Sequence, residues 1–298
     1  MAPDTVRTLF FGSALLTYLV AVFGSIIYLR WQRKTKWPFK ESDRLLRSPG
    51  EGLKRRVIEL DEKFVFEVLG ALVAIPFAWA ISAALAKAFG LAGVTALVAI
   101  CGGILCVIVL SAWRVTKLWK ERSNHFLGWF GERLTAEKLQ PLQERGYQVF
   151  HDFPAEPGKK GFNIDHVVVG PTGVSIVEVK TRRKGNARAG RKEHEVIFDG
   201  TQLDWPWGLD RHGVQQAINE ASWLKKWIFE RTGLNVTVKA VLTLPGWYVR
   251  EAPSSAIRVV NPSFLPDVIT GRGDATLSSQ NIDLIARQLD QRCRDVED

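Results

Sequence analysis

Two carboxylates and one lysine stand where the sequence predicts a short β-hairpin. Asp165 lies in one apolar run, and Glu178 and Lys180 lie in the next. The first run, the turn and the second run are Asn163–Val169, residues 170–173 and Val174–Lys180. The turn reads Gly-Pro-Thr-Gly, which is typical of a tight reversal between two strands. Paired carboxylates beside an ammonium are groups that could hold a hard cation and stabilise negative charge during a reaction.

The expected pairing of the two strands brings these side chains together. If Gly170 pairs with Gly173, Asp165 lies directly opposite Glu178, and Lys180 shares the face of Glu178 because side chains alternate along a strand. Burying such ions without compensation costs several kcal/mol each. A divalent cation bound between the carboxylates could offset this cost. The alternative is a plain surface ion pair at the hairpin edge, and the three residues alone do not exclude it.

The surrounding motifs carry a family resemblance. The segments concerned are Gly131-Glu132, Asn163–Gly170, Gly173–Thr181, and Gln216-Ala217 with Leu224 eight residues after the Gln. In this order, over roughly residues 128–245, they resemble the NERD (nuclease-related domain) family, which looks like a branch of the PD-(D/E)XK nuclease superfamily. The resemblance implies a restriction-endonuclease-like α/β/α domain with a central mixed sheet.

The resemblance also implies a role for each motif residue. Asp165 and Glu178 would bind a metal ion, Mg²⁺ or Mn²⁺, together with Glu132 from the first helix. Lys180 would be catalytic, and Gln216 from a later helix would complete the catalytic set. His166 should point to the face opposite Asp165 and is interpreted as structural.

A strongly basic segment follows Lys180. Its six cations are Arg182, Arg183, Lys184, Arg188, Arg191 and Lys192. One interpretation is a solvated loop, and the other is an arm that contacts nucleic-acid phosphates beside the active site. Trp205 and Trp207 come next and could stack on bases or cap the core.

Further elements complete the predicted soluble domain. Trp223 and Trp227, four residues apart on the Gln216 helix, are expected in the core. The predicted helices are His125–Arg145, ended by Gly146, and Leu277–Arg292, and the remaining predicted strands are Tyr147–Phe150, Val236–Leu244 and Ile257–Val260.

The positive charge of the chain belongs to its first part. The net charge is +9, but residues 1–123 contribute +8 and residues 124–298 only +1. The overall basicity therefore gives no support for nucleic-acid binding by the second part. The three cysteines, Cys101, Cys106 and Cys293, have neither disulfide-framework nor zinc-ligand spacing.

The first 123 residues predict a membrane domain. Three apolar runs of about the length that crosses a bilayer occupy residues 9–29, 68–86 and 91–113. Segment 30–63 carries eleven Lys and Arg residues, whereas only Arg7 precedes the first run. The Lys/Arg bias therefore predicts that the N-terminus lies outside and that the loop 30–63 and the domain 124–298 lie in the cytoplasm.

The predicted function is a membrane-anchored, metal-dependent nuclease that hydrolyses DNA or RNA, with DNA the first candidate and no small-molecule cofactor. The sequence leaves two alternatives open. One is a catalytically inactive module that binds nucleic acid or protein, and the other is a membrane scaffold that functions through its membrane-spanning segments. The sequence has no P-loop and no dinucleotide-binding glycine motif.

Overall fold

The computed structural model describes residues 17–18, 20–28, 45–155, 162–251, 256–271 and 277–294. The chain divides into two units, Met1–Leu45 and Leu46–Asp298. Of the predicted span 9–29, the structure describes residues 17–18 and 20–28, which are helical, and the other residues of the span lie outside the described residues. All helices and strands named below belong to the second unit.

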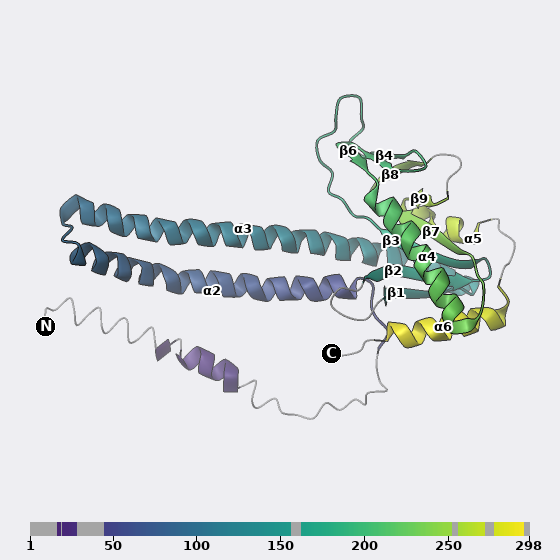
Figure 1. Ribbon diagram of the computed structural model, residues 1–298, viewed down its shortest axis with the longest axis horizontal. Helices are drawn as coiled ribbons and strands as arrows, with labels where there is room; N and C mark the ends of the chain where they lie inside the picture. The colour runs from purple at the N-terminus through teal and green to yellow at the C-terminus, as the bar shows by residue number, and fades with distance from the viewer. Residues whose placement is uncertain are drawn as a thin grey trace. The chain divides into compact units, whose positions relative to one another are not determined.

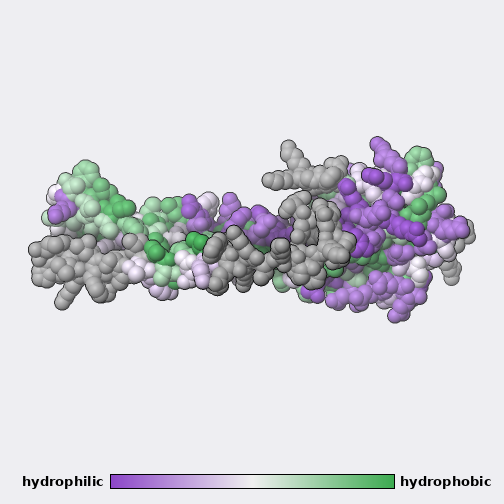
Figure 2. Space-filling model, turned by 90° about the horizontal axis from the view of Figure 1, so that it is seen from below, coloured by the Kyte–Doolittle hydropathy of each residue, from purple (hydrophilic) through white to green (hydrophobic). Residues whose placement is uncertain are grey.

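Two long helices, α2 (Glu51–Ala88) and α3 (Gly93–Leu139), form an antiparallel hairpin and lie side by side (Figure 1). They contain the predicted span 68–86 and residues 93–113 of the predicted span 91–113, and both are long and apolar enough to cross a bilayer. Their large apolar side chains are exposed; examples are Leu72, Phe77, Ile81, Val94, Leu97 and Leu105. Figure 2 shows hydrophobic surface toward the end of the hairpin that is remote from the sheets.

Helix α3 corrects one expectation. A span and a separate soluble helix, His125–Arg145, were predicted, but α3 runs without a break from Gly93 to Leu139. The 3-10 helix η2 (Gln140–Arg145) follows, and Gly146 ends it at φ +79°, as its role as C-cap predicts. The polar residues between the two predicted helices include neither Gly nor Pro, so nothing in them stops the helix. The predicted domain boundary after Ser123 therefore falls inside α3.

Ion pairs join the polar halves of the two helices. Arg56 Nη2 lies 2.6 Å from Glu121 Oε1, and Arg122 pairs with Asp61. Near the junction with the sheet domain, Leu60 of α2 is buried. The hairpin therefore continues past its apolar segments as a polar stalk, which we define as residues 51–67 of α2 and 114–131 of α3.

The main sheet has five strands in the order β1-β2-β3-β7-β9. Their bounds are Gln148–Pro154, Asn163–Gly170, Gly173–Val179, Val238–Thr243 and Arg258–Val260. The first three strands are antiparallel, whereas β7 and β9 run parallel to β3. The sheet is therefore mixed, as predicted, and the carboxyl ends of β3, β7 and β9 lie at one edge.

Helices cover both faces of this sheet. Helices α4 (His212–Thr232) and α6 (Ser279–Cys293) pack on one face, where Val167, Val169 and Ile176 point. The end of α3, with η2 and α5 (Leu265–Thr270), covers the other, where Val168 and Val177 point. The strict alternation of these valines and Ile176 buries both faces of β2 and β3, which gives the predicted α/β/α layers.

A second sheet was not predicted. Its strand order is β6-β5-β4-β8, with bounds Gly208–Asp210, Leu203–Trp205, Glu195–Phe198 and Tyr248–Glu251. Phe198, Leu203 and Trp205 from these strands are fully buried in the core shared with α4. All four strands have only three or four residues and lie next to polar loops, which makes them hard to recognise from periodicity.

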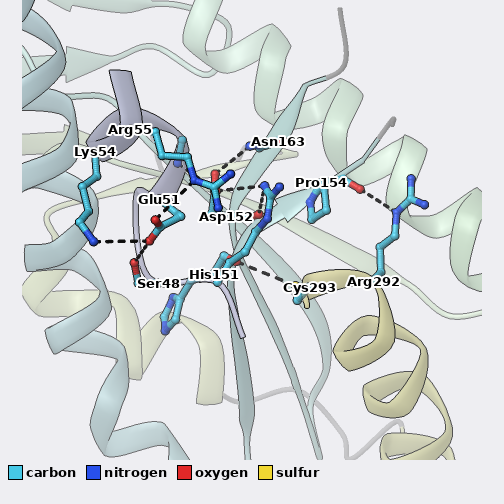
Figure 3. A network of polar contacts seen from close by, with 12 residues as sticks. Ser48, Glu51, Lys54, Arg55, His151, Asp152, Pro154, Asn163, Arg292 and Cys293 are labelled. Atoms are coloured by element: carbon cyan, nitrogen blue, oxygen red, sulfur yellow. Dashed lines mark hydrogen bonds and ion pairs between the residues drawn. The ribbon is translucent and has the colours of Figure 1, made fainter. Parts of the chain in front are cut away.

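The start of α2 is fastened to β1 through Asp152 (Figure 3). The Asp152 carboxylate accepts hydrogen bonds from Arg47 Nη1 at 3.2 Å, from the backbone N–H of Gly52 at 3.2 Å and from Asn163 Nδ2 at 2.9 Å. Asp152 is buried and has φ +47°, the only positive φ of a non-glycine residue in the described part of the chain. These bonds hold a left-handed backbone conformation that costs about 1–3 kcal/mol.

We expect Asp152→Ala to lower the free energy of unfolding by about 2 kcal/mol, because three hydrogen bonds to the buried Asp152 carboxylate are lost while the strained backbone remains. Asp152→Asn should cost less, since asparagine keeps an acceptor oxygen and tolerates this φ. Thermal melts of the two variants beside wild type measure the difference. Equal losses for both would mean that the acceptor is not what holds α2 on β1.

Candidate active site

Strands β2 and β3 place the two predicted carboxylates side by side. Gly170 pairs with Gly173, as predicted, and the register continues to His166 opposite Val177. The next pair along this register is Asp165 with Glu178. Asp165 Oδ2 accepts a hydrogen bond of 2.8 Å from the backbone N–H of Val179, which anchors this carboxylate at the strand end. Glu178 is only 1% exposed, whereas Asp165 is half-buried.

Lys180 lies just past β3 and reaches back into the same site. Its backbone N–H donates to Thr243 O at 2.9 Å, which extends the pairing of β3 with β7 by one residue. The Lys180 ammonium donates to Glu178 Oε1 at 2.6 Å and to Gln216 Oε1 at 2.8 Å. A Cβ at Gly213 would lie 3.1 Å from Lys180 Cγ, so the glycine leaves room for the lysine stem to pass along α4.

Helix α4 supplies Gln216 and a residue that the sequence reasoning missed. Gln216 Nε2 donates to Glu220 Oε1 at 2.8 Å, one helical turn further on. Because the amide nitrogen is engaged by Glu220, the amide oxygen of Gln216 turns toward Lys180. Glu220 is 3% exposed. Its spacing of four residues from Gln216 is the signal that could have identified it, since such residues share one helix face.

Helix α3 supplies Glu132, the carboxylate expected from the first helix. The Glu132 side chain is buried. The preceding residue, Gly131, lies against Thr181, and a Cβ there would come within 2.3 Å of the Thr181 hydroxyl. The absence of a side chain at Gly131 thus lets α3 approach the segment that follows Lys180. The structure therefore brings Glu132, Asp165, Glu178, Lys180 and Gln216 to one edge of the main sheet.

Three carboxyl groups of this site, those of Glu132, Asp165 and Glu220, have raised pKa values, because they are buried and close to other carboxyl groups. Burial raises the pKa of Glu220 to about 9, and the charge of Glu178 adds to the effect. Burial raises the pKa of Glu132 to about 8, helped by the charges of Asp152 and Glu178. The pKa of Asp165 is also raised well above its ordinary value by burial and then by Glu178. A single lysine therefore does not compensate the negative charge of the site.

The lysine itself stays charged. Burial lowers the pKa of Lys180, but the charge and hydrogen bond of Glu178 outweigh it, so the net pKa is raised. Lys180 therefore provides a fixed positive charge rather than a proton acceptor at neutral pH. This arrangement can stabilise negative charge that develops on a bound group.

The donor set of the site fits a hard divalent cation. Among the described residues, no N–H or hydroxyl group donates a hydrogen bond to two buried oxygens, Glu178 Oε2 and Glu220 Oε2, and these two carboxyls lie close enough to share a proton. Mg²⁺ and Mn²⁺ prefer carboxylate oxygens, and a cation would relieve the charge that raises the carboxyl pKa values. Within the described residues, no three His, Cys, Asp or Glu side chains are grouped tightly enough to enclose an ion as they stand.

The six basic residues after Lys180 have different surroundings. Arg188 Nη2 and Arg191 Nη2 both pair with the carboxylate of Asp204 in β5. Lys192 lies 3.9 Å from Glu195. Arg182, Arg183 and Lys184 are exposed, although Arg182 lies 3.4 Å from Asp210 and Arg183 donates to Ser123 in α3.

We expect Arg182, Arg183 and Lys184 to bind most of the phosphates that this segment engages. When the three are replaced together by glutamine, the affinity for nucleic acid should depend less steeply on salt. The slope of log affinity against log salt concentration should fall by about one unit for each phosphate that is no longer neutralised. The double variant Arg188→Gln/Arg191→Gln should change the slope little and lower stability instead. Fluorescence anisotropy over a salt series measures both slopes, and an unchanged slope for the triple variant would make these residues bystanders.

Burial assigns structural roles to His166 and to Trp205, Trp223 and Trp227. His166 is fully buried, and its Nδ1 lies 2.9 Å from Nδ1 of His151 on the face away from Asp165, which fits the structural role expected of it. Trp205 is 1% exposed and stacks on Trp207, so it caps the core. Trp227 is buried and Trp223 packs against the same core, as predicted.

A comparison with protein families finds a match in the α/β part of the chain. Residues 127–245 match the model of the NERD family, which is described as a nuclease-related domain. The match begins in α3 before Glu132, ends just after β7 and contains all the site residues described above. It confirms the resemblance predicted from the sequence. The searches of curated proteins and of solved structures found no match.

Proposed function

We propose that the nuclease-related domain at residues 127–245 is a metal-dependent nuclease that hydrolyses phosphodiester bonds of DNA or RNA, carried on a membrane by the helical hairpin. The observation that carries the proposal is the position of Lys180. Its ammonium lies between Glu178 and Gln216 at a strand end where Asp165 and Glu132 also converge. A surface ion pair, the alternative considered for this hairpin, would not be expected to leave Glu178 only 1% exposed.

Each residue of the site has a separate task in this proposal. Glu132, Asp165 and Glu178 would hold Mg²⁺ or Mn²⁺. The bound ion would supply a water of lowered pKa and neutralise charge on the phosphate. Lys180 places a positive charge next to the scissile phosphate, where it stabilises the additional negative charge of the transition state. Gln216 holds the ammonium of Lys180 in place through its amide oxygen.

Glu220 acts as a positioning residue in this scheme. Its carboxylate engages the amide nitrogen of Gln216, so the amide oxygen remains directed at Lys180. In the proposal, Glu220 does not touch the phosphate. The chain from Glu220 through Gln216 to Lys180 therefore links α4 to the reacting end of β3.

The test is a cleavage assay on labelled single- and double-stranded DNA and RNA, with Mg²⁺ or Mn²⁺ against chelator. The full chain in detergent is the right sample, because a truncation at residue 124 would cut through α3 and remove the hydrogen bond of Gly52 to Asp152. Metal-dependent cleavage that Glu178→Gln abolishes is the expected result. Metal-independent binding without cleavage would support the inactive binding module instead.

Membrane attachment is the second part of the proposal. It is supported by the apolar halves of α2 and α3, whose large side chains are exposed over a length sufficient to cross a bilayer. The polar stalk begins where these segments end, and its ion pairs are of the kind found in water. With residues 9–29 as a further span, the chain would cross three times.

We expect the N-terminus outside and the nuclease-related domain in the cytoplasm, because the basic segments 30–63 and 114–122 flank the spans on one side. A reporter fused after residue 298 should report the cytoplasm, and one placed before residue 9 should report the outside. Extraction of the full chain by carbonate without detergent would contradict insertion, and an external signal at residue 298 would contradict this orientation.

A further inference from the structure

A groove of about 680 Å³ is lined by residues that follow strands β3, β7 and β9 in the chain. We call it the aromatic groove and define it by six of its lining residues: Lys184, His194, Trp247, Tyr248, Asn261 and Phe264. They come from the segment after β3, from the start of β8 and from the segment after β9. None of the catalytic or metal-holding residues proposed above lines it.

The aromatic groove lies where the parallel strands of the main sheet end. Lys180 pairs with Thr243 at the carboxyl ends of β3 and β7. Four residues further along each of these segments stand Lys184 and Trp247, and both line the groove. The Trp247 indole N–H donates to Arg182 O at 3.3 Å and joins the two segments. Ligands of sheets with parallel strands bind outside the carboxyl ends, so this is the expected side for a substrate.

The walls of the groove combine exposed rings with a rigid floor. Tyr248 is 62% exposed and Phe264 is 59% exposed, although both are large aromatic side chains. Trp247 beneath them is 1% exposed and fixed by its bond to Arg182 and by Asn261, which donates to Trp247 O at 2.8 Å. Rings that remain exposed on a fixed base are surfaces on which a flat group can stack.

The charge of the groove favours an anionic occupant. The Lys184 ammonium lies 5.8 Å above the Trp247 ring, and the exposed Arg182 and Arg183 lie immediately before it in the chain. The acidic lining residue, Glu251, is already engaged by the Arg258 guanidinium and by the backbone N–H of Val259. A phosphate near Lys184 therefore meets a cation and no uncompensated carboxylate.

We infer that the aromatic groove binds single-stranded nucleic acid, with bases stacked on Tyr248 and on Phe264 and a phosphate next to Lys184. The inference rests on the proposed function, and it names the substrate class as a strand whose bases are unpaired. Stacking on a protein ring requires a free base face, which a duplex does not offer away from its ends. Arg182 and Arg183 stand between Lys180 and the groove residue Lys184 in the chain and would direct the strand to the site.

Binding of fluorescein-labelled oligothymidine to the full chain in detergent and chelator tests the inference without any cleavage. Tyr248→Ala and Phe264→Ala should each weaken binding roughly tenfold, the size of one base–ring stacking interaction. Tyr248→Phe keeps the ring and should bind as wild type does. Phe229→Ala removes an equally exposed ring, 55% exposed on α4 and outside the groove, and should also have no effect. Affinity for a blunt duplex should change much less than affinity for the single strand.

The possible results separate the groove from the catalytic proposal. The inference is overturned if both alanine variants bind like wild type, if Phe229→Ala weakens binding as much, or if duplex affinity falls equally. A wild-type chain that does not bind oligothymidine overturns it as well.

Groove-dependent binding by a chain that never cleaves would support the inference about the groove and refute the proposed nuclease activity. Cleavage that is unaffected in both alanine variants, with unchanged binding, would refute the groove alone. Lys184→Gln provides a further check, since the affinity difference from wild type should vanish at high salt.

Discussion

Lys180→Ala should abolish cleavage while leaving the affinity for Mn²⁺ unchanged or higher. The rate should fall on the order of a hundredfold to a thousandfold, the usual effect of removing one group that stabilises transition-state charge. Metal binding should survive because the carboxylates remain and a nearby positive charge is removed. Asp165→Ala, in contrast, should lose both metal binding and cleavage. Calorimetry of Mn²⁺ binding beside cleavage rates measures the two properties separately.

The same variant separates catalysis from a purely structural ion pair. Lys180 is the cation that contacts the buried Glu178 carboxylate, so its removal should cost about 3 kcal/mol of stability in the metal-free protein. If the carboxylates form a metal site, Mn²⁺ should restore part of this stability, whereas in a structural ion pair it should not. Lys226→Ala, with its lysine 79% exposed on α4, is the matched control. A Lys180→Ala chain that cuts at the wild-type rate would remove Lys180 from the mechanism.

The second large effect concerns pH. In the absence of divalent metal, the free energy of unfolding should fall as pH rises from 7 to 9. The folded pKa values of Glu132 and Glu220, about 8 and about 9, lie above the ordinary value of 4.5 expected in the unfolded chain. Between these values the folded state holds protons that the unfolded state has released, so each rise in pH favours unfolding. The decrease should be on the order of 3 kcal/mol over this range.

Above pH 7 the two buried histidines, His151 and His166, no longer change the free energy of unfolding with pH. Burial lowers the pKa of His151 to about 4 and that of His166 well below its ordinary value. Their contribution has the opposite sign: it rises with pH and is complete above the ordinary pKa of 6.5. Below pH 6.5 the two effects therefore partly cancel, whereas above pH 7 the carboxyls dominate, joined near pH 9 by the Cys293 thiol, whose pKa burial raises to about 12.

Glu220→Gln assigns the part of the pH effect that belongs to Glu220, and Glu132→Gln assigns the part that belongs to Glu132. Glutamine cannot titrate, yet its amide oxygen can still accept the hydrogen bond from Gln216. Thermal melts of this variant between pH 7 and pH 9 should show a shallower decline, with higher stability than wild type at pH 9. Addition of Mg²⁺ to wild type should flatten the profile as well. Stability that rises with pH in wild type, or an unchanged slope in the variant, would contradict the assignment.

What the sequence by itself determined is local. The four-residue turn fixes the register of β2 with β3, and strand alternation then places Asp165 opposite Glu178 with Lys180 on the same face. The two long apolar runs in α2 and α3 were visible for a similar reason, since the length of an uncharged run needs no partner to be recognised. The family motifs added Glu132 and Gln216 because each has a characteristic neighbour in the sequence, Gly131 and Ala217.

Only the tertiary structure decided the surroundings of these residues. Gln216 donates a hydrogen bond to Glu220, and Arg188 and Arg191 pair with Asp204. Asp152 holds the start of α2 on β1. Hydrophobic periodicity does not indicate any of these contacts. The second sheet is equally non-local, because its strands are too short to be recognised alone and are stabilised by burial of Trp205 and Phe198 against α4. A sequence pattern specifies which face a side chain takes, but its neighbours across the core depend on how the layers pack together.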